Sequence, residues 1–199
     1  MPPIVDADAL VVLGGSMSCQ GDAEAPWLAP TRQLISRTVR AGTPFLGICL
    51  GHQLATVALG GQVCTSDHFC LGAAEMHLTP EGKKDPLLSV YDGHRGIHFN
   101  NDVAVVLPED AVLLARDPTG QIEAVRFAER AWGVQFHPEC TPEIFDAWTI
   151  GHGEKEWQQR LPWSEAVTVA ETVRRDIDTV NAEEAFAARF QELIDPEKR

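Results

Sequence analysis

The chain of 199 residues is long enough for one domain with a substantial core and too short to hold two large ones comfortably. Its 29 Asp and Glu against 16 Lys and Arg give a formal net charge of −13, which repels phosphate backbones and anionic lipid and disfavours nucleic-acid and membrane roles. The longest apolar runs, around Ala9–Leu13 and Phe45–Leu50, are far shorter than a membrane span.

The cysteine and histidine pattern argues against disulfides and metal sites. The five cysteines are an odd number without Cys-x-x-Cys spacing, and the seven histidines are scattered, so we predict no disulfide framework, no zinc site and no cofactor. His94 and His98 lie four residues apart, but a solvent-facing or hydrogen-bonding role fits them better than ligation. Because Met1–Asp6 lacks the basic and apolar regions of a secretory signal, we expect a cytoplasmic protein.

The first predicted strand, Ala9–Leu13, leads into a candidate ligand-binding loop. Its continuous apolar run is typical of a parallel strand buried on both faces, and Gly14-Gly15 follows it directly. Because ligands sit at the carboxyl ends of such strands, Gly15 is a candidate to offer its backbone N–H to a ligand. The alternative is an ordinary flexible turn. An amphipathic helix is then predicted over Pro30–Ala41, and Gly42 stops it.

Cys49 lies at a predicted turn from strand to helix. The segment Thr43–Leu46 reads as a short buried strand, and Leu50–Leu59 has helical composition and spacing. The unpaired N–H groups and positive dipole at a helix start stabilise a thiolate, which is the nucleophilic form of cysteine. The alternative is a buried cysteine that serves only as a small apolar side chain.

The residues around Cys49 fit a nucleophile elbow. Gly47 and Gly51 flank the cysteine symmetrically, and an elbow of this kind needs small neighbours because the turn packs closely against its helix. The same turn aims the N–H of Leu50 at an oxyanion formed on a substrate. One short stretch thus supplies a nucleophile and part of an oxyanion hole.

The region from residue 60 to residue 130 is predicted to form short strands, because apolar stretches are broken there by Gly, Pro and charged residues. They are expected to be antiparallel strands at a sheet edge or in a small second sheet. The candidates are Gln62–Cys64, Gly72–Leu78, Leu87–Val90, Gly96–Phe99, Val103–Leu107, Val112–Ala115 and Ile122–Phe127, with a turn at Asp117–Gly120.

A candidate general base follows the next predicted strand, Ala131–Phe136. Residues two apart in an extended chain project to the same side, so His137 and Glu139 can face one direction, with Pro138 halting the ladder between them. A histidine held beside a carboxylate has a fixed tautomer and orientation. The alternative is an exposed turn, which the nearby cysteine elbow makes less favourable.

The carboxyl-terminal part is predicted to be helical. A short helix opens at Thr141 or Pro142 and runs through Trp148 until Gly151–Gly153 breaks it; an amphipathic helix runs from Ser164, breaks near Asn181 and resumes over Glu183–Ile194. The order of elements predicts an α/β fold of three layers, with a mostly parallel open sheet flanked by helices and a few antiparallel edge strands. We expect one domain over residues 1–160, with residues 161–199 as a helical extension packed on it.

Three separated motifs together resemble the class I glutamine amidotransferases, particularly stand-alone members similar to the glutaminase domain of GMP synthase. The motifs are Gly14–Ser18, Gly47–Gln53 and Gly133–Glu139, and the resemblance covers roughly residues 8 to 150. It implies a catalytic triad of Cys49, His137 and Glu139 that cleaves the side-chain amide of glutamine through a thioester.

The resemblance also implies the rest of the site. The N–H groups of Gly15 and Leu50 would hold the oxyanion, and Gln53 matches the family glutamine that contacts the substrate. The segment His98–Asp102 occupies the place of a family segment that closes over the substrate, which makes Asn100 and Asn101 candidate substrate-binding residues. The family normally has His or Ser where Asn100 lies.

The sequence departs from the family pattern at its start. An additional strand and helix usually precede the equivalent of Ala9, and Gly-Gly-Pro is common where Gly14-Gly15-Ser16 stands here. We therefore expect the core beside this strand to be covered by upstream residues, by another chain or by a rearranged edge.

Three functions remain open from the sequence. The first is glutamine hydrolysis with ammonia passed to a partner synthetase, since no Walker-type phosphate loop is present for acceptor chemistry. The second is hydrolysis of γ-glutamyl amides or peptides without ammonia transfer, and the third is a catalytically inert regulatory subunit. Assembly into a homo-oligomer is left open as well.

Overall fold

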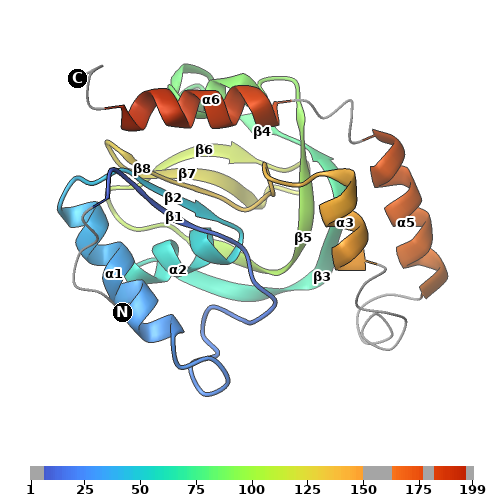
Figure 1. Ribbon diagram of the computed structural model, residues 1–199, viewed down its shortest axis with the longest axis horizontal. Coiled ribbons are helices and arrows are strands. Elements are labelled where there is room, and N and C mark those ends of the chain that lie inside the picture. Colours follow the sequence, from blue (N-terminus) through green and yellow to red (C-terminus); the bar gives the residue numbers. More distant parts are fainter. Residues whose placement is uncertain (1–6, 150–162, 177–181, 196–199) are drawn as a thin grey trace.

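The computed structural model describes residues 7–149, 163–176 and 182–195 (Figure 1). The strands are β1 (Leu10–Val12), β2 (Phe45–Ile48), β3 (Gln62–Glu75), β4 (His77–Leu78), β5 (Arg95–Val106), β6 (Val112–Arg116), β7 (Ile122–Ala128) and β8 (Ala131–Val134). The helices are α1 (Leu28–Arg40), α2 (Leu50–Ala58), α3 (Pro142–Thr149), α5 (Trp163–Asp176) and α6 (Glu183–Ile194), with 3₁₀ helices η1 (Gly82–Lys84) and η2 (Leu88–Tyr91). The predicted breaks at Gly151–Gly153 and near Asn181, and the predicted domain boundary after residue 160, lie outside the described residues.

A six-stranded open sheet in the order β1-β2-β8-β7-β6-β4 forms the centre of the molecule. β1, β2 and β8 pair in parallel, and β8, β7, β6 and β4 pair antiparallel. The antiparallel strands β7, β6 and β4 extend the sheet from β8 to one edge, where the sequence predicted a few antiparallel strands. The short links explain the antiparallel pairing, because strands joined by a tight turn such as Asp117–Gly120 must run in opposite directions.

The second sheet is a long two-stranded antiparallel ribbon of β3 and β5. Sequence analysis predicted two short strands in place of each of them, Gln62–Cys64 and Gly72–Leu78 for β3, and Gly96–Phe99 and Val103–Leu107 for β5. This was wrong, because each strand is continuous. An irregularity in the pairing between Thr65 and Cys70 lets the ribbon pass through residues 66–69 without a break.

The predicted strand Leu87–Val90 was also wrong, because η2 occupies this stretch. The buried carboxylate of Asp85 accepts hydrogen bonds from the N–H groups of Leu87 at 2.9 Å and Leu88 at 3.0 Å, and from Nε1 of Trp132 at 3.2 Å. A side chain that binds the backbone two and three residues ahead starts a helical turn and withdraws those groups from a strand ladder.

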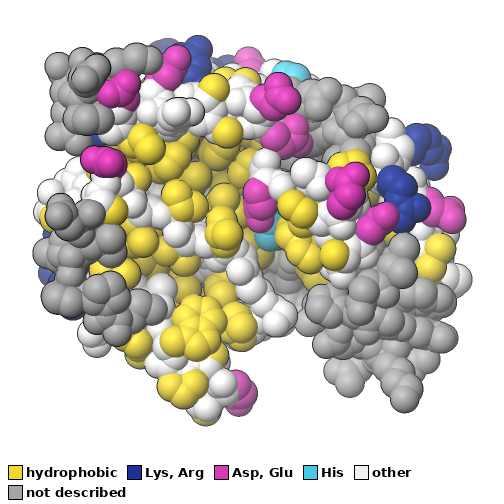
Figure 2. All heavy atoms as spheres, viewed as in Figure 1, with side chains coloured by type: hydrophobic (Ala, Val, Ile, Leu, Met, Phe, Trp, Pro, Cys, Tyr) yellow, Lys and Arg dark blue, Asp and Glu magenta, His cyan; other side chains and the backbone are white. Residues whose placement is uncertain are grey.

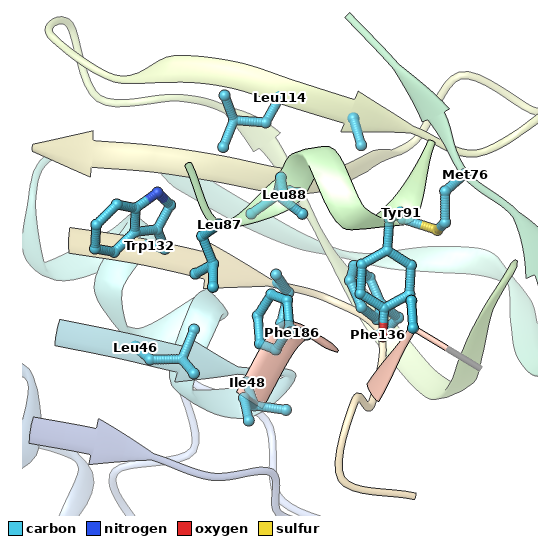
Figure 3. Packing of buried hydrophobic residues seen from close by; sticks show 14 of the residues in the cluster. Leu46, Ile48, Met76, Leu87, Leu88, Tyr91, Leu114, Trp132, Phe136 and Phe186 are labelled. Carbon is cyan, nitrogen blue, oxygen red and sulfur yellow. The ribbon is translucent and has the colours of Figure 1, made fainter. Parts of the chain in front are cut away.

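Helices cover both faces of the six-stranded sheet, as the three-layer prediction requires (Figure 1). On one face, Phe186 and Phe190 of α6 and residues of η2 pack on β2 and β8, and Figure 3 shows this cluster around Phe136, Trp132 and Leu46. On the other face, α1 and α2 pack on the sheet through the cluster that contains Leu28, Ile35, Leu50, Leu54, Phe45 and Val125. The fold class expected from the sequence is confirmed.

A third cluster joins the ribbon to α3 and α5. Its buried members are Ile97 of β5, Cys140, Phe145 of α3, and Ala170 and Val173 of α5. α3 and α5 therefore lie together beside the ribbon, at the end of the sheet where β5 runs past it (Figure 1).

β1 forms one edge of the six-stranded sheet. Val11 and Leu13 are 44% and 56% exposed, and hydrophobic side chains gather on this face below α6 (Figure 2). Among the described residues, none of the helices combines the length and apolar character needed to cross a lipid bilayer.

His52 is a buried histidine in the middle of the core. It stacks on Phe127 with ring centroids 5.9 Å apart, and a Cβ at Gly133 would lie 2.5 Å from its Nδ1. Neither ring nitrogen has a hydrogen-bond partner within the part of the chain that the structure describes. Burial lowers the pKa of His52 to about 4, so the side chain is neutral in the folded protein.

We expect His52→Leu to make the protein less sensitive to acid. An unfolded histidine titrates near pH 6.5, so protons bind the unfolded chain preferentially as the pH falls from about 6.5 toward the folded pKa of about 4. Between pH 7 and pH 5, the wild type should lose about 2 kcal/mol more of its free energy of unfolding than the variant. Urea unfolding of both proteins at the two pH values measures this difference. Equal losses would contradict it.

Candidate active site

Cys49 occupies the tight turn between β2 and α2, as predicted. Among the described non-glycine residues it alone has a positive φ, with φ 51° and ψ −106°. Its N–H donates to the carbonyl of Val134 on β8 at 2.8 Å, which ties the turn to the centre of the sheet. A backbone conformation that L residues rarely adopt costs about 1–3 kcal/mol and persists only where the surroundings impose it.

The two flanking glycines allow this turn to pack. A Cβ at Gly51 would lie 2.0 Å from the carbonyl oxygen of Val12, and a Cβ at Gly47 would lie 2.6 Å from the backbone of Gly51. Both contacts involve backbone atoms that cannot move aside, so any larger residue displaces the elbow from β1 or from its own helix.

His137 and Glu139 form the predicted pair. His137 Nδ1 lies 2.8 Å from Glu139 Oε1, and the N–H of His137 donates to the carbonyl of Ile97 on β5 at 2.8 Å. β8 ends at Val134, two residues before the predicted end, so a turn instead of an extended strand brings the two side chains together. The carboxylate fixes the ring orientation and leaves Nε2 free of that contact.

The structure brings Cys49 and His137 together, although they are far apart in the sequence. A Cβ at Gly14 would lie 2.9 Å from His137 Cε1 and 3.5 Å from Cys49 Cβ, so both side chains pack on the same glycine. Burial favours a lower pKa for His137, but its contacts with Cys49 and Glu139 outweigh burial and raise the pKa to about 9. The imidazole therefore carries a proton at neutral pH.

Gly15 and Leu50, the two predicted oxyanion-hole residues, are neighbours. A Cβ at Gly15 would lie 2.8 Å from Leu50 Cδ2, and Gly15 lines the space next to Cys49. Leu50 is the first residue of α2, where backbone N–H groups have no partner inside the helix. This arrangement suits an anion next to the sulfur.

A polar cavity of about 120 Å³ opens on one side of Cys49. The three predicted substrate-binding residues, Gln53, Asn100 and Asn101, all line it, together with Gly15, Ser16, Met17, Ser18, Phe99 and Asp102. The amide nitrogen of Gln53 already donates to the carbonyl of Asp102 at 2.8 Å and to Gln135 Oε1 at 3.2 Å. Only its amide oxygen is left to meet a substrate, and that oxygen is an acceptor.

Asp102 gives the polar cavity its negative charge. Its carboxylate accepts hydrogen bonds from the hydroxyl groups of Ser18 at 2.7 Å and Thr65 at 2.8 Å. These bonds join the loop after β1 to both strands of the ribbon and hold the carboxylate in place. Sequence analysis placed Asp102 in the closing segment without giving it this function.

A second, mostly apolar cavity of about 430 Å³ also reaches Cys49 and adjoins the polar cavity, with which it shares Gly15, Ser16 and Phe99. Phe99, Ile144, Trp148 and Leu13 line it, along with His137, Glu139, Gly14, Gly15 and Ser16. Trp148 packs against His137 with ring centroids 4.5 Å apart and meets the edge of Phe99 at 5.9 Å. We call these spaces the polar cavity and the apolar cavity.

Sequence analysis did not indicate the partners of Ile144, Trp148 and His98. Ile144 and Trp148 lie four residues apart on α3, a spacing that places them on one face of a helix, but nothing in the sequence indicated that this face meets His137. For His98 the hydrogen-bonding role, one of the two expected, is confirmed: the side chain is buried, and its Nε2 lies 2.7 Å from Glu123 Oε2. Burial favours a lower pKa for His98, but pairing with Glu123 outweighs it and raises the pKa.

Comparison with known families assigns the chain. Residues 3–151 match the model of the family described as glutamine amidotransferase class-I. The chain belongs to the class I glutamine amidotransferase family. This match confirms the family and the class of enzyme expected from the three motifs.

Individual relatives support this assignment. The chain is 32% identical over 161 residues to the glutamine amidotransferase-like protein YfeJ of Salmonella typhimurium, covering 78% of this chain and 66% of YfeJ. It is 28% identical over 187 residues to a glutamine-hydrolyzing GMP synthase of Aeropyrum pernix, covering 87% of this chain and 35% of the synthase. The chain thus spans less than two thirds of either relative.

A solved structure shows the same fold. The crystal structure of a glutamine amidotransferase from Thermotoga maritima aligns with a TM-score of 0.80 at 21% identity, over 98% of this chain and 81% of that one.

Proposed function

We propose that this protein hydrolyses a glutamyl side-chain amide through Cys49, His137 and Glu139. The observation that carries the proposal is the strained cysteine of the elbow packed on the same glycine as a histidine whose Nδ1 is held by Glu139. Relatives whose names include glutamine amidotransferase and glutamine-hydrolyzing GMP synthase support the choice of amide.

The first half-reaction forms a thioester. The Cys49 sulfur attacks the amide carbon while its proton resides on His137, and the carbonyl oxygen becomes an oxyanion held by the N–H groups of Gly15 and Leu50. The C–N bond then breaks as His137 gives the proton to the departing nitrogen. The raised pKa of His137, about 9, fits this role because the imidazole holds a proton at neutral pH.

The second half-reaction returns the enzyme to its starting state. His137, now neutral, takes a proton from water as the water oxygen attacks the thioester carbon. The C–S bond breaks, glutamate leaves, and the proton returns to the pair of His137 and Cys49. Glu139 keeps the ring in one orientation through both steps.

The polar cavity is the proposed place for the amino-acid end of the substrate. Asp102 and the amide oxygen of Gln53 suit the α-ammonium, and the donors of Ser16 and Asn101 suit the α-carboxylate. Where the substrate is glutamine itself, the departing nitrogen leaves as ammonia, and we propose that a synthetase partner would receive it. Cys19, Cys49, Cys64 and Cys140 are free thiols, which suits a reducing cytoplasm for this enzyme.

The test is covalent labelling with a diazoketone analogue of glutamine. We expect the label on Cys49, loss of activity with one label per chain, and protection by excess glutamine. Cys64 is exposed and serves as an internal control, because iodoacetamide should label it while glutamine leaves that rate unchanged. A folded protein that shows no label on Cys49 and releases no glutamate from glutamine or from γ-glutamyl amides would instead be the inert subunit.

A further inference from the structure

The apolar cavity lies on the side of Cys49 from which the leaving group departs. The acid that protonates the departing nitrogen must reach it, and His137 lines the apolar cavity together with Cys49 and Glu139. The polar cavity adjoins it at Cys49, Gly15, Ser16 and Phe99, and it alone holds the amide and carboxylate side chains of Gln53, Asn100, Asn101 and Asp102, which suit an amino acid. A substrate that bridges the sulfur therefore places its glutamyl end in the polar cavity and its amine in the apolar cavity.

The apolar cavity is much larger than ammonia requires. A molecule of this size occupies about 30 Å³, the share of one water in the liquid, whereas the cavity measures about 430 Å³. Its walls include the side chains of Phe99, Ile144 and Trp148, which come from β5 and α3. Such walls stabilise an apolar group by removing its surface from water. Ammonia has no apolar surface to bury, so it is not stabilised in this way.

The charges around the apolar cavity exclude one class of amine. Its lining among the described residues includes no lysine and no arginine, and Glu139 already pairs with His137. An amino acid as leaving group, as in a γ-glutamyl peptide, would bring a carboxylate into this space, where the protonated His137 is already paired with the carboxylate of Glu139. The chain as a whole carries a formal net charge of −13, which adds repulsion.

We propose that the substrates are γ-glutamyl amides of apolar primary amines, with the amine substituent bound between Phe99, Ile144 and Trp148. This proposal rests on the proposed function and specifies its substrate class. The reaction balances as for glutamine: the Cys49 sulfur bonds to the amide carbon, the C–N bond breaks, His137 protonates the amine, and water then releases glutamate. The products are glutamate and the free apolar amine.

The experiment compares kcat/KM across one series of purified substrates. The series is glutamine, γ-glutamyl methylamide, γ-glutamyl butylamide, γ-glutamyl benzylamide and γ-glutamylglycine, with release of glutamate as the common readout. Benzylamine and ammonia have similar basicity, so the comparison of those two substrates reports binding in the cavity more than leaving-group chemistry. We expect kcat/KM to be about 10-fold or more higher for the benzylamide than for glutamine, and to be highest for the benzylamide and lowest for γ-glutamylglycine.

Two variants and a matched control test whether the preference for the benzylamide arises from the walls of the apolar cavity. Trp148→Ala and Ile144→Asn should each lower the ratio of kcat/KM for benzylamide to that for methylamide by about 5-fold or more, because each removes apolar wall from the cavity. Trp27→Ala removes a tryptophan that is 42% exposed and lines neither cavity, and it should leave the ratio unchanged.

The outcomes separate this proposal from the function on which it rests. Hydrolysis of glutamine that depends on Cys49, with a kcat/KM for the benzylamide no higher than that for glutamine, would overturn the substrate class and leave the mechanism standing. Best activity on γ-glutamylglycine would do the same. If no compound in the series is hydrolysed, the proposed function itself fails and the substrate class with it.

Discussion

Replacing Cys49 by alanine is expected to lower kcat for the best amide substrate by at least about 10⁴-fold. The sulfur forms the only covalent bond to the substrate in the proposed mechanism, and no other cysteine lines either cavity within the described structure. Since alanine can adopt the same strained backbone at similar cost, the free energy of unfolding should change by no more than about 1 kcal/mol. Single-turnover kinetics and urea unfolding measure the two quantities.

Cys19→Ala is the matched control for this prediction. Cys19 is also fully buried, and burial raises the pKa of its thiol to about 11, so it is not expected to form a thiolate at neutral pH. Its removal should leave kcat within about 2-fold of the wild type. Turnover by the Cys49→Ala protein near the wild-type rate would refute the proposed nucleophile.

Replacing Glu139 by glutamine is expected to lower kcat by about 10²- to 10⁴-fold. The amide keeps the size of the side chain but removes the negative charge of Glu139 Oε1, which lies 2.8 Å from His137 Nδ1. That charge favours the protonated imidazole and fixes the orientation of the ring. The carboxylate is one of the groups that raise the pKa of His137 to about 9, so its loss moves that pKa down. The alkaline limb of the kcat/KM profile, where the acid loses its proton, should therefore shift to lower pH.

Glu143→Gln separates this effect from a general loss of negative charge. Glu143 is exposed on α3, where it accepts a hydrogen bond from Thr141 and lines neither cavity. Its neutral variant should keep both kcat and the pH profile. A Glu139→Gln protein with low kcat but an unmoved alkaline limb would show that Glu139 acts on the fold and not through the proton of His137.

The parts of the site that could be read from the sequence are those contained in a few consecutive residues. The elbow depends on Gly47, Cys49 and Gly51, and the histidine pair on residues 137 and 139, so local spacing carries most of their geometry. That Cys49 and His137 meet was implied only by the resemblance to the family. The structure shows the reason, because parallel strands β2 and β8 are neighbours whose carboxyl ends lie at one edge.

Contacts between distant segments could not be read in this way. The hydrogen bond of Gln53 to Gln135 joins residues 82 apart, and the pair His98–Glu123 depends on how the ribbon crosses the sheet. The apolar cavity likewise forms only because α3 packs beside β5, and the sequence of either segment alone does not predict that contact. The short apolar run 87–90 fits a strand or a helix equally, and the side chain of Asp85 decides between them.

Because of the positive φ of Cys49, selection for stability and selection for activity favour different residues at position 49. Glycine adopts φ 51° without the strain that any other residue bears there, so a library screened only for resistance to heat should enrich glycine at position 49 and lose the sulfur. Laboratory evolution of a more thermostable enzyme from this protein must therefore screen for turnover in every round.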